Sequence, residues 1–197
     1  MTTADWDPRA LPSLDGRTVV VTGGNAGIGY FVSEQLASAG AHVVIAARSA
    51  EKARLAIDTI RSRYPDAELA HVPLDLTSLA SVRRAAEELA AFRPLHGLVN
   101  NAGRVVASRR RLETEDGFEL TVGGNFLGHF ALTTLLFPAL APEGRVVGLG
   151  SDSTRMVRLE PANLWSEGRY DAFRAYAYSK HAVTGFQLEL ARRLAAA

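Results

Sequence analysis

The sequence lacks cysteine entirely, which excludes disulfide bridges and thiolate metal sites and fits a reducing compartment. An excess of one charge is also missing, because 22 basic and 21 acidic side chains among 197 residues leave a net charge of +1. Proteins that bind nucleic acid or an anionic membrane normally need a basic face. We therefore predict no nucleic-acid partner.

Histidine and long apolar runs are scarce as well. The five histidines lie far apart without the paired spacing of metal ligands, so we interpret them as packed or surface residues and predict no metal site. The longest apolar stretch, residues 126–141, contains His129 and Pro138 and is shorter than the roughly 20 residues that span a bilayer. Residues 1–14 lack the basic start and apolar run of a secretory signal. We predict a buried helix in the apolar stretch, no membrane anchor and a cytoplasmic protein.

Short β-branched runs alternate with segments of helical period along most of the chain, a pattern typical of an α/β fold with a parallel sheet between two helical layers. With 47% hydrophobic residues we expect one domain over residues 1–197, in which residues 1–16 form a lead segment. The predicted strands are Thr18–Thr22, His42–Ala46, Leu69–Leu74, Leu98–Asn100 and Arg145–Leu149. The predicted helices are Ile28–Ala39, Glu51–Tyr64, Leu79–Phe92, Gly117–Leu140 and Phe173–Ala197.

A glycine-rich turn follows the first predicted strand, where TVVVT runs into GGNAGIG. Glycine lets an anion approach the main chain, and the N-terminus of the next helix favours negative charge, so this turn suits a pyrophosphate. The spacing of Gly23, Gly27 and Gly29 differs from the G-x-G-x-x-G fingerprint, and a glycine turn also occurs where only tight packing requires it. Its place after the first strand favours dinucleotide binding.

Arg48 follows the second predicted strand, nineteen residues after Gly29. An acidic residue there would accept hydrogen bonds from a ribose 2′-hydroxyl, whereas arginine pairs with a 2′-phosphate. Arg48 therefore favours NADP over NAD. The alternative is a solvated loop arginine, one of the 20 arginines in the chain.

Tyr176 and Lys180 stand four residues apart in YAYSK, and a helix places them on one face. The ammonium then favours the phenolate form, which makes the tyrosine a usable acid or base near neutral pH. The pairing is notable because the chain contains only two lysines, Lys52 and Lys180. Ordinary packing on a helix surface is the alternative reading.

Taken together, these motifs resemble the short-chain dehydrogenase/reductase family over nearly the whole chain. Its T-G-x-x-x-G-x-G stands at residues 22–29, its N-N-A-G at residues 100–103 and its Y-x-x-x-K at residues 176–180. The long interval between Ser151 and Tyr176 and the Leu-Gly-His-Phe segment look like the branch of retinol dehydrogenases and WW-domain oxidoreductases. The resemblance implies a Rossmann-like, doubly wound fold.

The resemblance also implies roles for individual residues. NADPH delivers hydride to a carbonyl carbon, Tyr176 donates a proton to its oxygen, Ser151 hydrogen-bonds that oxygen, and Asn125 positions a water that relays protons to Lys180. Asp75 contacts the adenine. The expected catalytic residues are Ser151, Tyr176, Lys180 and Asn125. The expected cofactor-binding residues are Gly23, Asn25, Gly27, Ile28, Gly29, Arg48, Asp75, Leu76, Asn101, Ala102, Gly103, Tyr176 and Lys180.

Two features depart from the family pattern. Gly148-Leu149-Gly150-Ser151 replaces the usual Asn-Val-Ser-Ser, and Gly123 and Gly124 weaken the helix before Asn125, by about 1 kcal/mol each relative to alanine. Family members also continue past the Tyr–Lys helix, so we expect the last strands of the family fold to be absent and the fifth strand to form an exposed edge.

Two hypotheses follow for the function. The first is an NADP-dependent oxidoreductase that interconverts a small-molecule carbonyl and an alcohol, with reduction of a lipophilic ketone or aldehyde as the expected direction. The second is a truncated, inactive module that binds NADP or a partner. Residues 109–111, a run of three arginines, are a solvated loop or a contact for an acidic substrate group. We further predict a homodimer or homotetramer that associates through the Gly117–Leu140 and Tyr–Lys helices, as is typical of the family.

Overall fold

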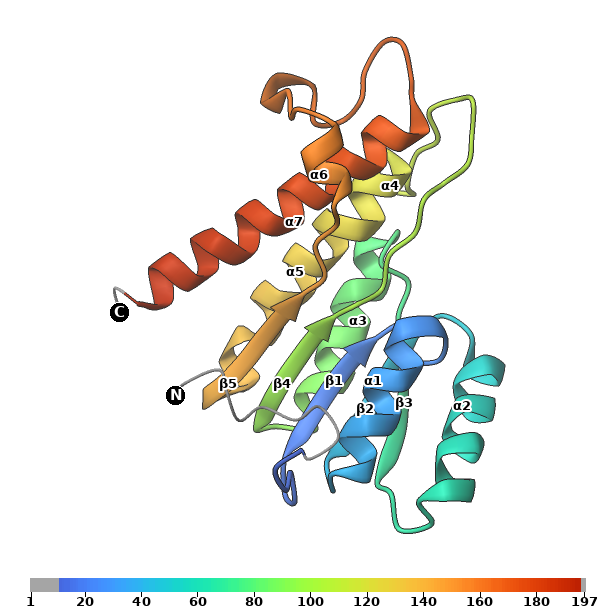
Figure 1. Cartoon of the computed structure of the whole chain (residues 1–197), viewed down its shortest axis with the longest axis vertical. Helices are drawn as coiled ribbons and strands as arrows, with labels where there is room; N and C mark the ends of the chain where they lie inside the picture. Colours follow the sequence, from blue (N-terminus) through green and yellow to red (C-terminus); the bar gives the residue numbers. More distant parts are fainter. Residues whose placement is uncertain (1–10, 196–197) are drawn as a thin grey trace.

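Five apolar segments pair side by side into a single parallel sheet in the order β3-β2-β1-β4-β5 (Figure 1). The computed structural model describes residues 11–195, so the first ten residues of the predicted lead segment and the last two of the chain lie outside it. The strands are β1 (Thr18–Thr22), β2 (His42–Ala47), β3 (Leu69–Pro73), β4 (Leu95–Asn100) and β5 (Leu140–Gly148). The strand order reverses between β1 and β4. This arrangement confirms the predicted doubly wound α/β fold.

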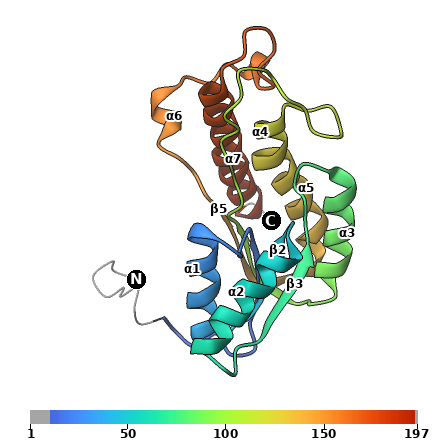
Figure 2. The same ribbon diagram turned by 90° about the vertical axis from the view of Figure 1, so that its right-hand side faces the viewer.

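Helices lie on both faces of the sheet (Figures 1 and 2). The long ones are α1 (Gly27–Ser38), α2 (Ala50–Arg63), α3 (Leu79–Ala90) and α7 (Ala172–Leu194). A composite helix consists of α4 (Leu120–Val122), the π-helix η2 (Gly123–Leu127), α5 (Gly128–Leu136) and the 3₁₀ turn η3 (Phe137–Ala139). Helices α1 and α2 cover one face and α3 and α5 the other, which gives the predicted three layers.

The alternation of side chains along β1 builds a separate core on each face. Val20 belongs to the apolar cluster with α3 and α5, where Leu89 and Leu132 are fully buried. Val21 points to the opposite cluster, beside Ile60 of α2. Because successive strand residues face opposite ways, a central parallel strand covered on both faces needs the unbroken apolar run that residues 19–21 supply.

The predicted helix Gly117–Leu140 is not continuous. It begins at Leu120 and is interrupted by the π-helix. Glycine explains the geometry, because a Cβ on Gly123 would lie 2.6 Å from Thr114 Cγ2 and a Cβ on Gly128 would lie 2.4 Å from the Leu76 carbonyl oxygen. Gly128 therefore allows this helix to lie close to the segment after β3, and Gly123 allows it to lie close to the segment before α4.

Other predicted boundaries shift by a few residues. Strand β4 begins three residues earlier and β5 five residues earlier than expected, and α7 ends at Leu194. The segment between Ser151 and Tyr176 contains α6 (Ser153–Met156) and the 3₁₀ turn η4 (Pro161–Asn163), which sequence periodicity did not reveal because both are about one turn long.

The segment Leu120–Ala139 is long and apolar enough to cross a bilayer by length and composition, yet half of it is buried within the fold. It packs against α3 and α7 and carries the buried polar residues His129 and Thr133. These contacts are those of a core helix in a globular domain.

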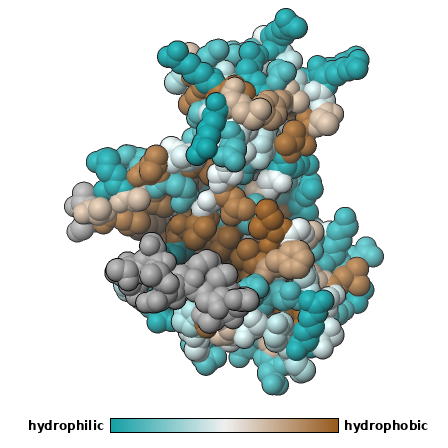
Figure 3. All heavy atoms as spheres, viewed as in Figure 1, coloured by the Kyte–Doolittle hydropathy of each residue, from teal (hydrophilic) through white to brown (hydrophobic). Residues whose placement is uncertain are grey.

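Strand β5 lies at the edge of the sheet formed by residues 11–195 and pairs there with β4. Val147 in this strand is 47% exposed. Figure 3 shows an apolar area in the middle of the face where Figure 1 draws the upper ends of β5 and β4. The structure thus has the exposed edge that the sequence predicted.

Candidate active site

A cavity of about 580 Å³ opens at the carboxyl ends of the strands, where the order reverses between β1 and β4. Ligands of open α/β sheets bind at this position. The cavity brings together residues from the glycine turn, the ends of β2 and β3, the N-N-A-G segment, the π-helix and α7. Every site residue predicted from the sequence lines it except Ser151.

The glycine turn has the backbone geometry that phosphate binding requires. Gly23 and Gly27 have φ angles of +65° and +54°, which favour glycine. A Cβ on Gly29 would lie 2.4 Å from the Gly23 carbonyl oxygen, so the strand-to-helix turn closes only around glycine. Ala26, at the N-cap of α1, has no side chain that accepts from the first N–H groups of the helix. This end of α1 therefore suits an anionic group.

The N-N-A-G segment fastens the glycine turn to the end of β4. Asn101 Nδ2 donates a hydrogen bond of 2.8 Å to the Thr22 carbonyl, and the Ala102 N–H donates one of 3.0 Å to Thr22 Oγ1. Asn100 Nδ2 reaches the other way and donates to Thr133 Oγ1 on α5 at 2.9 Å. The ends of β1 and β4 and the helix α5, which are far apart in sequence, are thereby held together beside the cavity.

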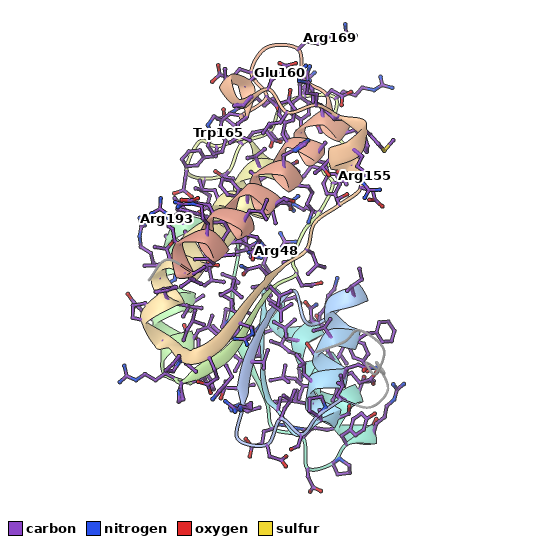
Figure 4. All side chains as sticks on the ribbon, turned by 60° about the vertical axis from the view of Figure 1, so that its left-hand side comes forward. Arg48, Arg155, Glu160, Trp165, Arg169 and Arg193 are labelled. Atoms are coloured by element: carbon purple, nitrogen blue, oxygen red, sulfur yellow. The ribbon has the colours of Figure 1, made fainter. Side chains whose placement is uncertain are left out.

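Arg48 and Asp75 line the part of the cavity next to β2 and β3. Arg48, labelled in Figure 4, directly follows β2 and precedes Ser49, which caps α2 by accepting from the Lys52 N–H at 3.2 Å. Asp75 Oδ1 accepts from both the N–H and the hydroxyl of Thr77, at 2.9 and 2.7 Å. The cap and this turn hold the Arg48 and Asp75 backbones in place beside the cavity.

Tyr176 and Lys180 lie on the same face of α7 and both line the cavity, as the spacing predicts. Asp171 caps the N-terminus of this helix, because its carboxylate accepts from the Arg174 N–H at 2.6 Å. Lys180 Nζ lies 5.8 Å from the centre of the Tyr176 ring and donates to the Leu149 carbonyl at 2.8 Å. Burial lowers the pKa of Lys180, because desolvation penalises the ammonium.

Asn125 stands in the π-helix and is 3% exposed. Its Oδ1 accepts from the Arg104 N–H at 3.0 Å, while its Nδ2 donates to the Arg104 carbonyl at 2.9 Å and to Ser179 Oγ at 3.1 Å. A Cβ placed on Gly103 would lie 3.5 Å from Lys180 Nζ and 3.6 Å from Asn125 Oδ1. The amide and the ammonium therefore flank one small space above Gly103.

Ser151 is the predicted site residue that the structure leaves outside the cavity lining. Its hydroxyl accepts from the Ser153 N–H at 3.2 Å, at the start of α6. The two residues before it, Leu149 and Gly150, line the cavity instead. Ser151 thus lies outside the cavity lining in a segment where Gly148 and Gly150 replace the polar residues usual in the family.

His129 is a buried residue of this region that no sequence motif indicated. It is 4% exposed and hydrogen-bonded to both Thr22 and Asn125, each of which belongs to a motif at the site. Its distance of four residues from Asn125 was the available signal, since residues four apart in a helix are neighbours. The contact with Thr22 could not be foreseen from a local pattern, because Thr22 ends β1, 107 positions from His129 in sequence.

An open parallel sheet with a glycine-lined cavity at its switch point defines the nucleotide-binding class of α/β proteins. Residues 17–197 match the sequence profile of the family described as short chain dehydrogenase. The chain belongs to the short-chain dehydrogenase/reductase family, whose members are NAD(P)-dependent oxidoreductases.

Polyprenol and retinol dehydrogenases are among the similar proteins. The chain is 44% identical to mouse polyprenol dehydrogenase over 197 residues, covering 96% of this chain and 58% of the mouse protein. It is 40% identical to human retinol dehydrogenase 11 over 184 residues, covering 92% of this chain and 57% of that protein. The chain thus spans less than two thirds of the length of these curated relatives.

Solved structures share the fold. A crystal structure of an uncharacterised protein from Mycobacterium paratuberculosis superposes with a TM-score of 0.85 at 40% identity, covering 97% of this chain and 67% of that one. The RhlG/NADP complex from Pseudomonas aeruginosa has a TM-score of 0.73 at 31% identity and covers 93% of this chain and 69% of that one.

Proposed function

We propose that this chain forms the cofactor-binding and catalytic part of an NADP-dependent oxidoreductase that interconverts a carbonyl and an alcohol. The observation that carries the proposal is that Tyr176 and Lys180 line the same cavity as the glycine turn. This shared cavity supports a role for Tyr176 as the proton donor beside a bound nicotinamide dinucleotide. The similarity to polyprenol and retinol dehydrogenases supports a lipophilic ketone or aldehyde as the substrate.

The glycine turn and the N-terminus of α1 fit a pyrophosphate, and Asp75 and Leu76, which line the same cavity, would contact the adenine of the bound cofactor. When bound, NADPH supplies the hydride that adds to the carbonyl carbon. Tyr176 donates its hydroxyl proton to the carbonyl oxygen, so that the developing alkoxide is neutralised as it forms. Lys180 stabilises the phenolate that remains, because its ammonium lies close to the tyrosine ring.

Asn125 and Lys180 restore the proton on Tyr176 in this proposal. Both flank the space above Gly103, where a water bridging the Asn125 amide and the Lys180 ammonium would have polar partners on two sides. Lys180 then returns a proton to the phenolate. Ser151 is assigned the hydrogen bond to the substrate oxygen, which requires the segment after β5 to turn its hydroxyl from Ser153 toward the cavity.

Arg48 supports NADP as the cofactor. It lines the cavity directly after β2, where a guanidinium pairs with a 2′-phosphate and an acidic side chain would bind a ribose 2′-hydroxyl. The NADP complex of a structurally similar protein is in accord with this choice.

A titration of NADPH and NADH against the wild-type protein and Arg48→Asp tests the assignment. We expect the wild type to bind NADPH at least about tenfold more tightly than NADH, because one charged hydrogen-bonded contact is worth about 1.5–3 kcal/mol. Arg48→Asp should abolish or reverse the preference without loss of folding. Equal affinities in the wild type would remove the NADP assignment.

An NADP-binding module without turnover is the second candidate, and the placement of Ser151 outside the cavity lining favours it. Measuring the oxidation of NADPH in the presence of lipophilic ketones and aldehydes distinguishes the two candidate functions. Binding without oxidation of NADPH by any of them would support the module. Oxidation that disappears in Tyr176→Phe would support the enzyme.

We place the protein in the cytosol and expect it to be a homodimer or homotetramer. Apolar side chains on the outer faces of α5 and α7 support self-association, since Leu135 is 46% exposed and Leu188 is 68% exposed. A contact through these helices would leave the cavity at the strand ends accessible to a small molecule.

A further inference from the structure

His129 lies at the centre of a buried chain of hydrogen bonds beneath the cavity. Its Nδ1 is 2.9 Å from the carbonyl oxygen of Asn125, and its Nε2 is 2.9 Å from Oγ1 of Thr22. Thr22 is the last residue of β1 and lies 107 positions away in sequence. One imidazole therefore joins the strand that leads into the glycine turn to the π-helix that carries Asn125.

The chemistry of the partners fixes the direction of these hydrogen bonds. A carbonyl oxygen only accepts, so Nδ1 must carry the hydrogen that Asn125 receives. Burial, together with the positive charge of Lys180, outweighs the hydrogen bond to Asn125 and lowers the pKa of His129 to about 4, so the ring is neutral near pH 7. In the neutral ring Nε2 has no hydrogen, and it therefore accepts from the Thr22 hydroxyl.

The same hydroxyl continues the chain to the N-N-A-G segment. Thr22 Oγ1 accepts from the Ala102 N–H at 3.0 Å, and its hydroxyl has two acceptors within reach, the Val99 carbonyl at 3.3 Å and His129 Nε2 at 2.9 Å. Because the neutral ring can only accept at Nε2 and this contact is the shorter one, we assign the hydroxyl hydrogen to His129. The hydrogen bonds thus run in one direction, from Ala102 through Thr22 and His129 to Asn125. Hydrogen bonds aligned in this way strengthen one another in a buried, low-dielectric environment.

We propose that His129 is a positioning residue that holds the glycine turn, the N-N-A-G segment and the π-helix in the arrangement that binds NADPH. This inference rests on the function proposed above. Each of the three segments lines the cavity, but they come from separate parts of the chain. A π-turn breaks the regular hydrogen-bond pattern of a helix, so a side-chain donor to the Asn125 carbonyl helps to define its geometry. An apolar residue of similar size would fill the space and leave the three segments uncoupled.

Variants that keep one of the two hydrogen bonds of His129 distinguish a positioning role from a packing role. His129→Asn retains an N–H donor near the place of Nδ1, and His129→Gln retains a polar group near the place of Nε2, whereas His129→Leu retains neither. Leu136→Ala is the matched control, because Leu136 is fully buried in α5 and packs in the apolar core away from the cavity lining.

NADPH affinity is measured by nucleotide fluorescence, and folding by thermal unfolding of the same samples. We expect His129→Leu to weaken NADPH binding about tenfold, in line with the loss of one or two buried hydrogen bonds. His129→Asn and His129→Gln should give intermediate affinities. Leu136→Ala should lower the melting temperature while changing affinity less than about twofold. Unchanged affinity in His129→Leu, or an equal loss in Leu136→Ala, would overturn the inference.

A second measurement keeps this inference separate from the proposed function. NMR of the ¹⁵N-labelled imidazole at pH 7 should show a neutral His129 with its hydrogen on Nδ1, and the opposite tautomer or a cationic ring would overturn the inference. If the wild type fails to bind NADPH, the proposed function falls. The inference is then decided by this spectrum and by a double-mutant cycle of Thr22→Val with His129→Leu, in which additive effects on stability would overturn it.

Discussion

Gly103 shows how a single small residue shapes the chemistry of the site. The space above it is flanked by Lys180 Nζ and Asn125 Oδ1, at 3.5 and 3.6 Å from the position of an added Cβ. These are ordinary van der Waals contacts, so a methyl group fits without displacing either side chain. It would, however, occupy the place in which a water could bridge the two groups.

We therefore predict that Gly103→Ala folds normally but loses turnover. The turnover number kcat should fall by at least about tenfold, since positioned proton transfer contributes about 10²–10⁴ to rate. Thermal unfolding and steady-state kinetics on a carbonyl substrate provide the measurements. Gly185→Ala, on α7 where an added Cβ meets open space, is the matched control and should keep the wild-type kcat. An unchanged kcat in Gly103→Ala would argue against a relay through this space.

His129 makes stability depend on pH at the scale of one residue. Its pKa is about 4 in the fold against an ordinary 6.5, because burial penalises the cation. Between these pH values the unfolded chain holds more protons than the folded one, so the free energy of unfolding falls as the pH drops. The full stabilisation is present above about pH 6.5 and is lost progressively toward pH 4.

Urea unfolding at pH 7, 6 and 5 measures this effect. We predict a decrease in the free energy of unfolding that approaches about 1.4 kcal/mol per pH unit from this one group. In His129→Leu the contribution should vanish, leaving a shallower dependence on pH. Equal slopes in the two proteins would contradict the assignment of this pH dependence to His129.

At the scale of elements, the long segment between β5 and α7 is held by contacts with the segment before α4. The Tyr170 hydroxyl donates to Glu119 Oε1 at 3.0 Å, and Glu119 is fully buried at the start of α4. The rings of Trp165, labelled in Figure 4, and Phe118 lie 4.9 Å apart. Burial and the Glu119 carboxylate together raise the pKa of Tyr170 to about 12, so it stays protonated and remains a donor.

Removing this donor should loosen the segment next to the site. We predict that Tyr170→Phe lowers the free energy of unfolding by about 1–3 kcal/mol, because a buried carboxylate loses a hydrogen bond. Denaturant unfolding monitored by tryptophan fluorescence measures the change. Glu119→Gln keeps an acceptor for the tyrosine and should cost less than Tyr170→Phe. A loss below about 0.5 kcal/mol in Tyr170→Phe would place this contact among weak surface interactions.

Glycines explain why the composite helix of α4, η2 and α5 departs from the sequence expectation. Gly123 and Gly124 reduce helix propensity, so the sequence predicts a weakened helix before Asn125. In the fold, a Cβ added to Gly123 would lie 2.6 Å from Thr114 Cγ2, and a Cβ added to Gly124 would lie 3.1 Å from Thr77 Cγ2. The lower helix propensity therefore accompanies a close approach of the π-helix to the segments that carry Thr114 and Thr77.

At the scale of the whole molecule, the exposed apolar side chains of α5 and α7 predict association between copies. Leu188 is 68% exposed on α7, and Phe130 of α5 packs against Phe186 of α7 with 5.2 Å between ring centres. Light scattering should therefore report a dimer or tetramer for the wild type. Leu188→Glu should shift the population toward monomer, because a charge would be buried in the contact. A wild-type monomer would contradict the prediction.

The layered α/β architecture follows from the amino-acid pattern alone, because apolar strands covered on both faces and amphipathic helices bury their surfaces in few other ways. The sequence also determined the glycine turn and the Tyr176–Lys180 pair, since both are local patterns whose geometry follows from a turn or one helical repeat.

Contacts between segments far apart in sequence became visible in the folded chain. Tertiary packing placed Ser151 outside the cavity lining, joined His129 to Thr22, and brought Gly103 between Asn125 and Lys180. Periodicity carries no information on such pairs, because their geometry is set by how β1, β4 and the two long helices pack. The hydrogen bonds that join Thr22, His129 and Asn125 beneath the cavity therefore depend on tertiary packing, whereas the hydrogen-bonding capacity of each residue follows from its own side chain.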